Sequence, residues 1–419
     1  MYALVDGNNF FVSCERVFDS SLDNKPVIVL SNNDGCAIAR SNEAKALGIK
    51  MGANYFEIEQ LVKRHNVQVF STNFVLYADM SMRMKGLLSR FTPAIEDYSI
   101  DEAFLDFTGF KTETLRDYCL DMSRTVRQGI GIPVGVGIAP TKTLAKVANR
   151  FAKKYPGYEG VAIIDTDAKR IKALQLTYIG DVWGIGRRHT ERLLNMGVKT
   201  AYDFTQLNRS WVRKHMTVVG ERTWRELHGQ PCIEMETVVP DKQSIMVSRS
   251  FGKMIEDFSI IKEAAATYTC MAAAKLRKQK SHAKALMVFL ETNRFRNDLP
   301  QNNQHTVITM PVATNSSLEI LHYVSKALER IYIPGYKYKK TGVMLMDISS
   351  EDAYQMNLWD NIDRTKHKRL MEVLDRTNEK WGRNSLKPAI LGDGQQWKIK
   401  QERLSPCYTT RMSDFPITK

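Results

Sequence analysis

The sequence predicts an α+β protein of several domains, and three observations support this class. The chain has 419 residues, more than one hydrophobic core usually serves, so about two to four domains are expected. Up to residue 154 the pattern reads strand, insertion, helix, strand, strand, helix, strand, helix. This order predicts a largely antiparallel sheet with a small inserted subdomain near residues 12–78. Residues 248–350 read as β-α-β-β-α-β, a ferredoxin-like order typical of a separate domain.

The composition is ordinary for a globular protein, but the charge is not. Hydrophobic residues make up 43% and charged residues 25% of the chain. The net charge is +14 and the pI is about 9.4, which favours a polyanionic partner, either nucleic acid or an anionic membrane surface. No apolar run approaches the length of a membrane span, and the first residues lack the pattern of a signal peptide. We therefore expect no membrane association and a cytoplasmic location.

Cysteine and histidine usage argues against zinc and disulfide chemistry. The six cysteines are dispersed without a C-x-x-C pair, as in proteins of a reducing cytoplasm. The eight histidines form no H-E-x-x-H or H-x-x-x-H cluster. Zinc ribbons, disulfide scaffolds and zinc catalysis are therefore not expected.

The stretch 98–107 combines an apolar pattern with two adjacent carboxylates, Asp101 and Glu102. It predicts a buried strand or a tight hairpin, in which unpaired charges cost on the order of several kcal/mol. A divalent cation such as Mg²⁺ removes that cost. Because successive strand residues face opposite ways, a second strand should supply another carboxylate, and Asp6 ends the apolar run 2–5. Each acid alone fits an exposed turn, but the three together favour a metal site.

Two aromatic residues follow this first acid. Phe10 and Phe11 fit the start of a helix that packs into the core. The alternative is that one ring lies under a nucleotide sugar and excludes a 2′-hydroxyl by size, a role that either residue fits.

Residues 26–48 predict two short strands joined by a turn, and then a helix that begins at Ser41 or Asn42. Arg40 and Lys45 flank this N-terminus, which is a plausible site for a triphosphate. Taken singly, each of these two basic side chains is also typical of a solvent-exposed surface.

Three longer helices are predicted over 81–92, 111–129 and 141–154, the last preceded by the glycine-interrupted strand 134–138. Lys153 lies near the end of the last helix, where a lysine either complements the helix dipole or contacts a phosphate. Proximity to the acidic site would separate these two interpretations.

Residues 180–204 predict two helices joined by a hairpin, with Gly184 and Gly186 at the opening of the second. Glycines leave the backbone N–H groups accessible to a phosphate, and Arg187 and Arg188 add positive charge. The pattern matches the helix–hairpin–helix that binds the duplex backbone regardless of sequence. We favour this interpretation over a plain helical turn.

The block 241–350, which follows a polar linker, is strongly basic, with 16 Lys and Arg against 9 Asp and Glu. A basic sheet face suits a nucleic-acid groove, and binding there would weaken steeply with salt. The candidate contacts that lie in its strands or their connections are Arg249, Lys253, Arg294 and Arg296.

A short motif near the C-terminus fits the pocket of a protein partner. It joins a glutamine to three apolar residues in a polar setting: Gln355, Met356, Leu358 and Trp359. A helix is predicted over 366–380, and we assign no chemistry to the rest of the tail.

Four motifs together resemble the Y-family translesion DNA polymerases: Asp6 with Phe10-Phe11, Ser41–Lys45, Tyr98–Phe104 and Gly137–Lys146. Four others resemble the UmuC-type chains, the catalytic subunits of bacterial DNA polymerase V, rather than the DinB type: Leu30–Cys36, Asp181–Arg188, Ser248–Gly252 and Ser405-Pro406 with Tyr408–Arg411. The resemblance runs through the whole chain.

The resemblance implies a right-hand polymerase with a ferredoxin-like palm, small fingers, a helical thumb and a ferredoxin-like little finger. The implied bounds are palm 1–10 and 79–166, fingers 11–78, thumb 167–235 with its helix–hairpin–helix at 180–204, linker 236–242, little finger 243–350, and a C-terminal tail 351–419 with a clamp-binding peptide at 355–359.

The resemblance also implies roles for the residues singled out above. Asp6, Asp101 and Glu102 would be the catalytic acids and hold two Mg²⁺ ions, and Phe11 would be the steric gate. The other implied nucleotide contacts are Phe10, Arg40, Asn42, Lys45 and Lys153. The implied activity is error-prone synthesis opposite damaged template during the SOS response. The implied partners are primer-template DNA, a dNTP, a processed UmuD homodimer, RecA and a sliding clamp, with the active enzyme at the nucleoid.

Two other classes of function share part of this pattern. A palm-type nucleotidyl cyclase has similar carboxylates but no use for residues 180–204 or for the basic block. A catalytically silent DNA-binding subunit keeps those two features but has no need of the three acids, which are all present here.

Overall fold

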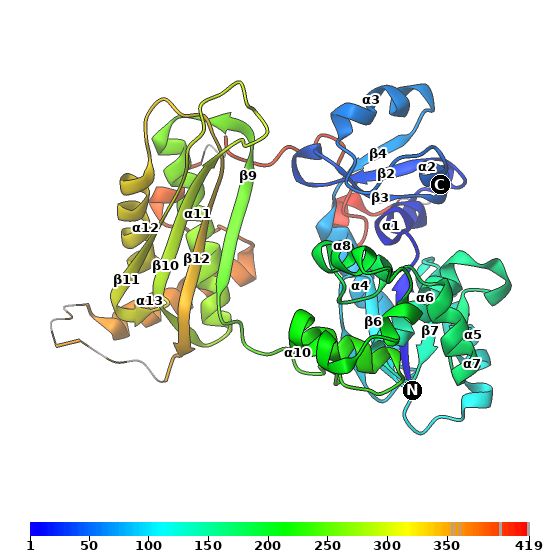
Figure 1. Ribbon diagram of the computed structural model, residues 1–419. Coiled ribbons are helices and arrows are strands. Elements are labelled where there is room, and N and C mark those ends of the chain that lie inside the picture. The colour runs from blue at the N-terminus through cyan, green and yellow to red at the C-terminus, as the bar shows by residue number, and fades with distance from the viewer. Residues whose placement is uncertain (353–354, 356, 359, 361, 394–395, 417–419) are drawn as a thin grey trace. The chain divides into compact units, whose positions relative to one another are not determined.

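The computed structural model describes residues 1–352, 355, 357–358, 360, 362–393 and 396–416. The chain divides into two units (Figure 1). One comprises Met1–Ser31, Gly35–Val239 and Arg403–Lys419, and the other comprises Asn32–Asp34 and Pro240–Glu402. In the part of the chain that the structure describes, every helix is too short or too polar to cross a lipid bilayer.

A five-stranded sheet organises the first unit. Its order is β5 (Ile95–Asp97), β6 (Glu102–Asp106), β1 (Tyr2–Gly7), β7 (Val134–Ala139) and β8 (Val161–Ile163). The central strand β1 is antiparallel to both neighbours, and β8 runs parallel to β7. The stretch 98–107 is therefore the turn and second strand of a hairpin, one of the two predicted outcomes.

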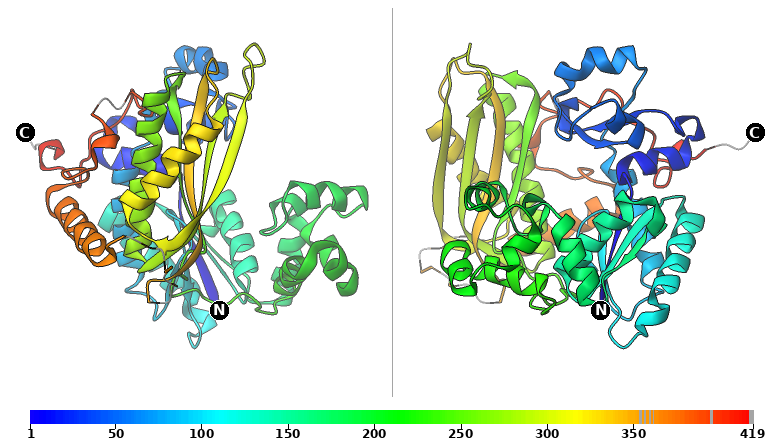
Figure 2. Two further views of the ribbon diagram at one scale, coloured as in Figure 1. Left: turned by 90° about the vertical axis from the view of Figure 1, so that its left-hand side faces the viewer. Right: turned by 45° about the vertical axis from the view of Figure 1, so that its right-hand side comes forward.

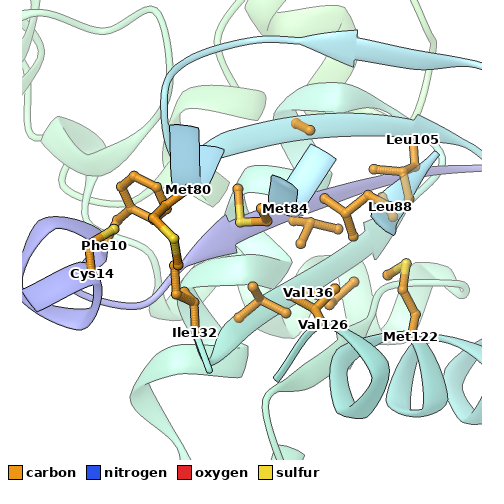
Figure 3. Packing of buried hydrophobic residues seen from close by; sticks show 14 of the residues in the cluster. Phe10, Cys14, Met80, Met84, Leu88, Leu105, Met122, Val126, Ile132 and Val136 are labelled. Atoms are coloured by element: carbon orange, nitrogen blue, oxygen red, sulfur yellow. The ribbon is translucent and has the colours of Figure 1, made fainter. Parts of the chain in front are cut away.

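One face of this sheet carries the larger core, which is shown in Figure 3. Side chains from α1 (Phe10–Phe18), α4 (Phe74–Leu88) and α5 (Thr112–Ile130) pack there on alternate strand residues. The prediction for residues 81–92 is corrected, because α4 begins seven residues earlier. Asn73 caps its first turn by accepting from the Leu76 N–H, and the apolar run that follows continues the buried stripe.

Helix α6 (Lys142–Lys154) covers the opposite face. It lies so close to β7 that a Cβ on Gly137 would come within 2.0 Å of the Asn149 backbone nitrogen. This contact explains the glycine in the middle of the strand.

A three-stranded sheet forms the inserted subdomain. Its order is β3 (Ala37–Arg40), β2 (Val27–Leu30) and β4 (Gln68–Ser71), with α2 (Asn42–Ala46) and α3 (Tyr55–Arg64) attached. Ser41 caps α2 by accepting from the Ala44 N–H, as one of the two predicted caps. Helices α7 (Asp167–Leu176), α8 (Arg187–Asn195), α9 (Ala201–Thr205) and α10 (Arg209–Leu227) follow, and they share a core with α6.

The second unit has the predicted β-α-β-β-α-β order. Its antiparallel sheet runs β11 (Asn303–Thr314), β10 (Ser281–Thr292), β12 (Tyr338–Ser350), β9 (Ile245–Ile255). Figures 1 and 2 show α11 (Phe258–Lys278) and α12 (Ser317–Ile331) on this sheet, and both contribute to one core with its strands. Helix α13 (Arg364–Trp381) follows. Among the described residues, 3₁₀ turns span Ser20–Leu22, Asn32–Asp34, Pro156–Tyr158, Ile179–Asp181, Ala389–Leu391 and Met412–Asp414.

Candidate active site

The three predicted acids meet at one end of β1 and β6. In the register of this pair, Asp6 lies directly opposite Glu102. Both side chains therefore point to the face that α6 covers. Asp101 stands in the turn just before β6, and its carbonyl accepts from the Gly7 N–H at 2.9 Å.

Each acid has a defined hydrogen-bonding partner. Lys153 Nζ lies 2.5 Å from Asp6 Oδ1, and Lys146 Nζ lies 2.9 Å from Glu102 Oε1. The Ser99 hydroxyl donates to Asp101 Oδ1 at 2.7 Å. Two lysines of α6, two turns apart, thus compensate part of the acidic charge.

Lys153 compensates the negative charge of Asp6 only in part. The pKa of its carboxyl is raised to about 6, chiefly by burial and to a smaller extent by the nearby charges of Glu102 and Asp101. The ion pair with Lys153 opposes this rise without cancelling it. A site that holds anionic carboxyls at this cost favours an additional cation.

The residues present fit a divalent cation by their chemistry. Carboxylate oxygens are the ligands of hard ions such as Mg²⁺, and Asp6, Asp101 and Glu102 offer them from adjacent strand ends. Within the described residues, no three His, Cys, Asp or Glu side chains are gathered closely enough to hold a metal. Lys153 and Lys146 contact carboxylate oxygens of Asp6 and Glu102, so an ion held by these acids would take the place of the lysines.

The structure separates the two aromatic candidates, which the sequence left open. Phe10 is 3% exposed and belongs to the core beneath β1. Phe11 is only partly buried, and its ring stacks on Tyr77 with the centroids 4.4 Å apart and 15° between the planes. Phe10 is thus a core residue, and Phe11 is the ring of the two that keeps an exposed part.

A polar cluster lies at the start of α1, where Asn9 is the N-cap residue. Lys45 Nζ donates to Asn9 Oδ1 at 2.6 Å and to Asn42 Oδ1 at 3.4 Å. Burial lowers the pKa of Lys45, with further lowering by Arg40 and Lys153 and an opposing effect of Asp6. Lys45 is therefore within electrostatic range of Asp6, and Lys153 contacts Asp6 directly. Arg40 itself is engaged with the Ile49 carbonyl at 2.7 Å.

Sequence reasoning missed two residues of this site, Lys146 and Asn9. Lys146 Nζ lies 4.2 Å from the centroid of the Tyr98 ring and 5.4 Å from that of Trp183, besides its bond to Glu102. The spacing of seven residues from Lys153 places both lysines on one face of a helix, a signal that would have found it. Asn9 has a left-handed backbone, with φ of 48° at the start of α1, and the sequence alone gives little sign of this.

The Gly184-Ile185-Gly186 motif lies directly before α8, as predicted. Gly184 has φ of +89°, which favours glycine, and Gly186 is the N-cap of α8 with open space around its α-carbon. The Arg187 side chain is 91% exposed and approaches Glu191 only to 3.8 Å. The preceding element is the short turn Ile179–Asp181 rather than a full helix.

The predicted DNA contacts of the second unit lie in different places. Lys253 and Arg294 are exposed, and Arg296 is exposed but forms a bidentate pair with Asp298 at 2.6 and 2.7 Å. Arg249 is flanked on β9 by the buried residues Val247 and Phe251, two positions away on either side. It therefore lies on the face that the helices cover, which does not fit the expected open basic face.

Part of the predicted clamp motif lies outside the described residues. Met356 and Trp359 are among those not described. Leu358 is 95% exposed, and Gln355 is exposed as well.

Comparison with known proteins identifies this arrangement. The profile of the impB/mucB/samB family matches residues 5–150, and that of its C-terminal domain matches residues 242–358. A domain of unknown function, DUF4113, matches residues 368–417. The protein UmuC of Salmonella typhimurium is 44% identical over 99% of both chains, and ImpB of the same organism is 40% identical over the full length of both. DNA polymerase IV 2 of Halalkalibacterium halodurans is 26% identical over 92% of this chain and 94% of its own.

Solved structures agree on the fold. A Y-family DNA polymerase chimera of Dbh and Dpo4 has a TM-score of 0.65 at 19% identity, covering 83% of this chain and 99% of the chimera. The fold is therefore that of the Y-family DNA polymerases, with palm, fingers, thumb and little finger. The chain belongs to the impB/mucB/samB family within this class, and its match to UmuC spans its whole length. Membership of this class implies a divalent metal requirement, which the three acids are suited to meet.

Proposed function

We propose that this chain is a template-directed DNA polymerase that adds deoxynucleotides opposite damaged template, in the error-prone synthesis of the SOS response. The observation that carries this proposal is the meeting of Asp6, Asp101 and Glu102 at one end of two paired strands. Lys153 and Lys146 are paired with Asp6 and Glu102. The relatives, UmuC and ImpB among them, support the translesion assignment.

The acids and lysines have complementary tasks in nucleotidyl transfer. Asp6 and Asp101 would hold two Mg²⁺ ions, and Glu102 would hold the ion nearer the primer terminus. These ions, when bound, stabilise the charge on the attacking 3′-oxygen and on the departing pyrophosphate. Lys153 and Lys45 orient the triphosphate and neutralise its developing charge.

Phe11 would select the sugar. Its ring is held by Tyr77 from below, so a ribonucleotide with a 2′-hydroxyl would clash with it while a deoxyribonucleotide would not. Asn42 and Arg40 complete the polar wall around the triphosphate, although Arg40 would first have to leave the Ile49 carbonyl.

Binding of primer-template DNA would rest on backbone contacts. The N–H groups near Gly184 and Gly186, together with Arg187, suit phosphate oxygens. Lys253 and Arg294 suit the same role in the second unit, which would be the little finger. Binding of this kind carries little sequence preference, as a polymerase requires.

We further propose that a processed UmuD dimer is a partner, because the chain matches UmuC over its whole length. RecA and a sliding clamp would complete the assembly, the latter through a motif in which Gln355 and Leu358 are exposed.

The test is primer extension by the full chain on undamaged template and on template with an abasic site, with and without clamp and RecA. The wild type should extend in Mg²⁺, and Asp101→Ala should abolish extension while primer-template binding stays nearly unchanged. Asp121→Ala, an exposed acid on α5, is the matched control. Extension by Asp101→Ala at the wild-type rate would overturn the mechanism.

A further inference from the structure

The C-terminal segment 403–408 is built into the first unit rather than trailing from it. Leu404 forms a parallel bridge with Ser71 at the end of the edge strand β4. The Ser71 N–H donates to the Arg403 carbonyl at 2.9 Å, and the Arg403 N–H donates to Ser71 Oγ at 3.0 Å. The segment therefore extends the sheet of the fingers subdomain by one residue pair.

A second set of contacts anchors the segment at the start of α4. The buried Asn73 amide donates to the Ser405 carbonyl at 3.0 Å and to the Pro406 carbonyl at 3.1 Å. Beyond it, Tyr408 stacks on Phe18 of α1, with the ring centroids 4.7 Å apart and 14° between the planes. These bonds fix the position of Ser405 between α1 and α4.

The Ser405 side chain reaches a buried carboxyl. Its hydroxyl donates to Glu15 Oε1 at 3.0 Å, and the Tyr77 hydroxyl donates to the same oxygen at 2.5 Å. Glu15 is 2% exposed and Tyr77 is fully buried. Burial raises the pKa of Glu15, and the hydrogen bonds from the Tyr77 and Ser405 hydroxyl groups oppose that rise. Removing a carboxyl from water costs free energy, and hydrogen bonds from neighbouring groups offset that cost when the carboxyl is buried.

The carboxyl is linked in turn to the proposed steric gate. Tyr77 is the residue on which the Phe11 ring stacks. The hydroxyl of Tyr77 is held by Glu15, so the plane and depth of the platform beneath Phe11 depend on a carboxyl that Ser405 helps to hold. A continuous series of contacts thus runs from Ser405 through Glu15 and Tyr77 to Phe11.

We propose that Ser405 is a positioning residue for sugar selection, and that the end of the region of unknown function serves to hold the steric gate in place. This inference rests on the proposed function, in which Phe11 is the gate. It assigns to the C-terminal segment a role in choosing deoxyribonucleotides over ribonucleotides. The mechanism is geometric, because loss of the Ser405 hydroxyl frees Glu15 and then Tyr77, and the Phe11 ring gains room to yield to a 2′-hydroxyl.

The test measures kcat/KM for a dNTP and for the matching rNTP with the full-length protein. Ser405→Ala should lower the ratio of the two values by about tenfold, as expected for loss of a hydrogen bond to a buried carboxyl. Ser405→Thr, which keeps the hydroxyl, should restore the ratio. Ser413→Ala removes an exposed hydroxyl that lies beyond this segment and donates to Asp414 Oδ1 at 2.9 Å, and it should leave the ratio unchanged.

A second variant separates positioning from general destabilisation. Tyr77→Phe keeps the stacked ring but removes its hydroxyl, and it should lower discrimination in the same way even if Ser405→Ala folds poorly. In a Phe11→Leu background, which lacks the gate, Ser405→Ala should cause no further loss of discrimination. A merely structural role would lower both kcat/KM values in parallel and would persist in that background.

The outcomes distinguish this inference from the function on which it rests. Absence of any primer extension by the wild type would overturn the proposed function. Unchanged discrimination in Phe11→Leu would remove Phe11 as the gate. Loss of discrimination in Phe11→Leu, with wild-type discrimination in both Ser405→Ala and Tyr77→Phe, would overturn the positioning role alone.

Discussion

Replacing Asp6 by Asn should make the metal-free protein more stable at neutral pH, although it should abolish catalysis. The pKa of Asp6 is raised from its ordinary value of 3.8 to about 6. This interval corresponds to about 3 kcal/mol of preference for the neutral carboxyl in the folded state. An amide at this position is permanently neutral and of nearly the same shape.

The sign of the pH dependence follows from the direction of this shift. Below pH 3.8 the carboxyl is protonated in both the folded and the unfolded chain, so its ionisation contributes nothing. Between pH 3.8 and about 6 the unfolded chain loses the proton first, and stability falls as the pH rises. Above about pH 6 the full penalty of about 3 kcal/mol persists. Loss of the Lys153 ion pair in the variant reduces the measured gain.

The assay is urea denaturation of wild type and Asp6→Asn from pH 4 to pH 8 without divalent ions. The free energy of unfolding of the variant minus that of the wild type should increase as the pH rises to about 6. Above that pH the difference should stay constant. Millimolar Mg²⁺ with a dNTP should then stabilise the wild type selectively, because ligand that binds the folded state shifts the equilibrium. Asp23→Asn, an exposed acid, is the control. A variant that is less stable than the wild type at every pH would refute the reasoning.

Two further predictions concern the lysine and arginine side chains around the site. Lys142 is fully buried and is paired with Glu96, so Lys142→Met should lower the free energy of unfolding by about 3–5 kcal/mol. The double variant with Glu96→Gln should recover part of this loss in chemical denaturation, and a single variant as stable as the wild type would contradict the prediction. Arg187→Ala should reduce the slope of log K for primer-template binding against log salt by about 1. Arg124→Ala, exposed on α5, should leave the slope unchanged, and equal slopes for all three proteins would rule out a phosphate contact by Arg187.

Local patterns predicted the parts of the site that depend on local structure. The acids were recognisable because charge embedded in an apolar strand is costly, and a short hairpin places Glu102 opposite Asp6 with Asp101 in the turn just before it. The cap at Ser41 and the β-α-β-β-α-β order were equally local. Adjacent residues such as Phe10 and Phe11 could not be separated, because which side of a helix is buried depends on what packs against it.

Features that depend on distant contacts were not predictable. Asn73 binds Ser405 across 332 residues of sequence, and no periodicity connects the two. The start of α4 was misplaced because its first turn is stabilised by the Asn73 cap and by packing on the sheet. Arg249 was expected on the open face of a sheet, but the alternation of side chains along β9 places it on the covered face.

The most direct test of the account is a crystal structure of the full chain with primer-template DNA, an incoming dNTP and Mg²⁺. The account predicts carboxylate oxygens of Asp6, Asp101 and Glu102 at about 2.0–2.1 Å from the bound ions, with Lys153 and Lys146 released from their present partners. Ions bound elsewhere, with both lysines still paired to Asp6 and Glu102, would contradict it.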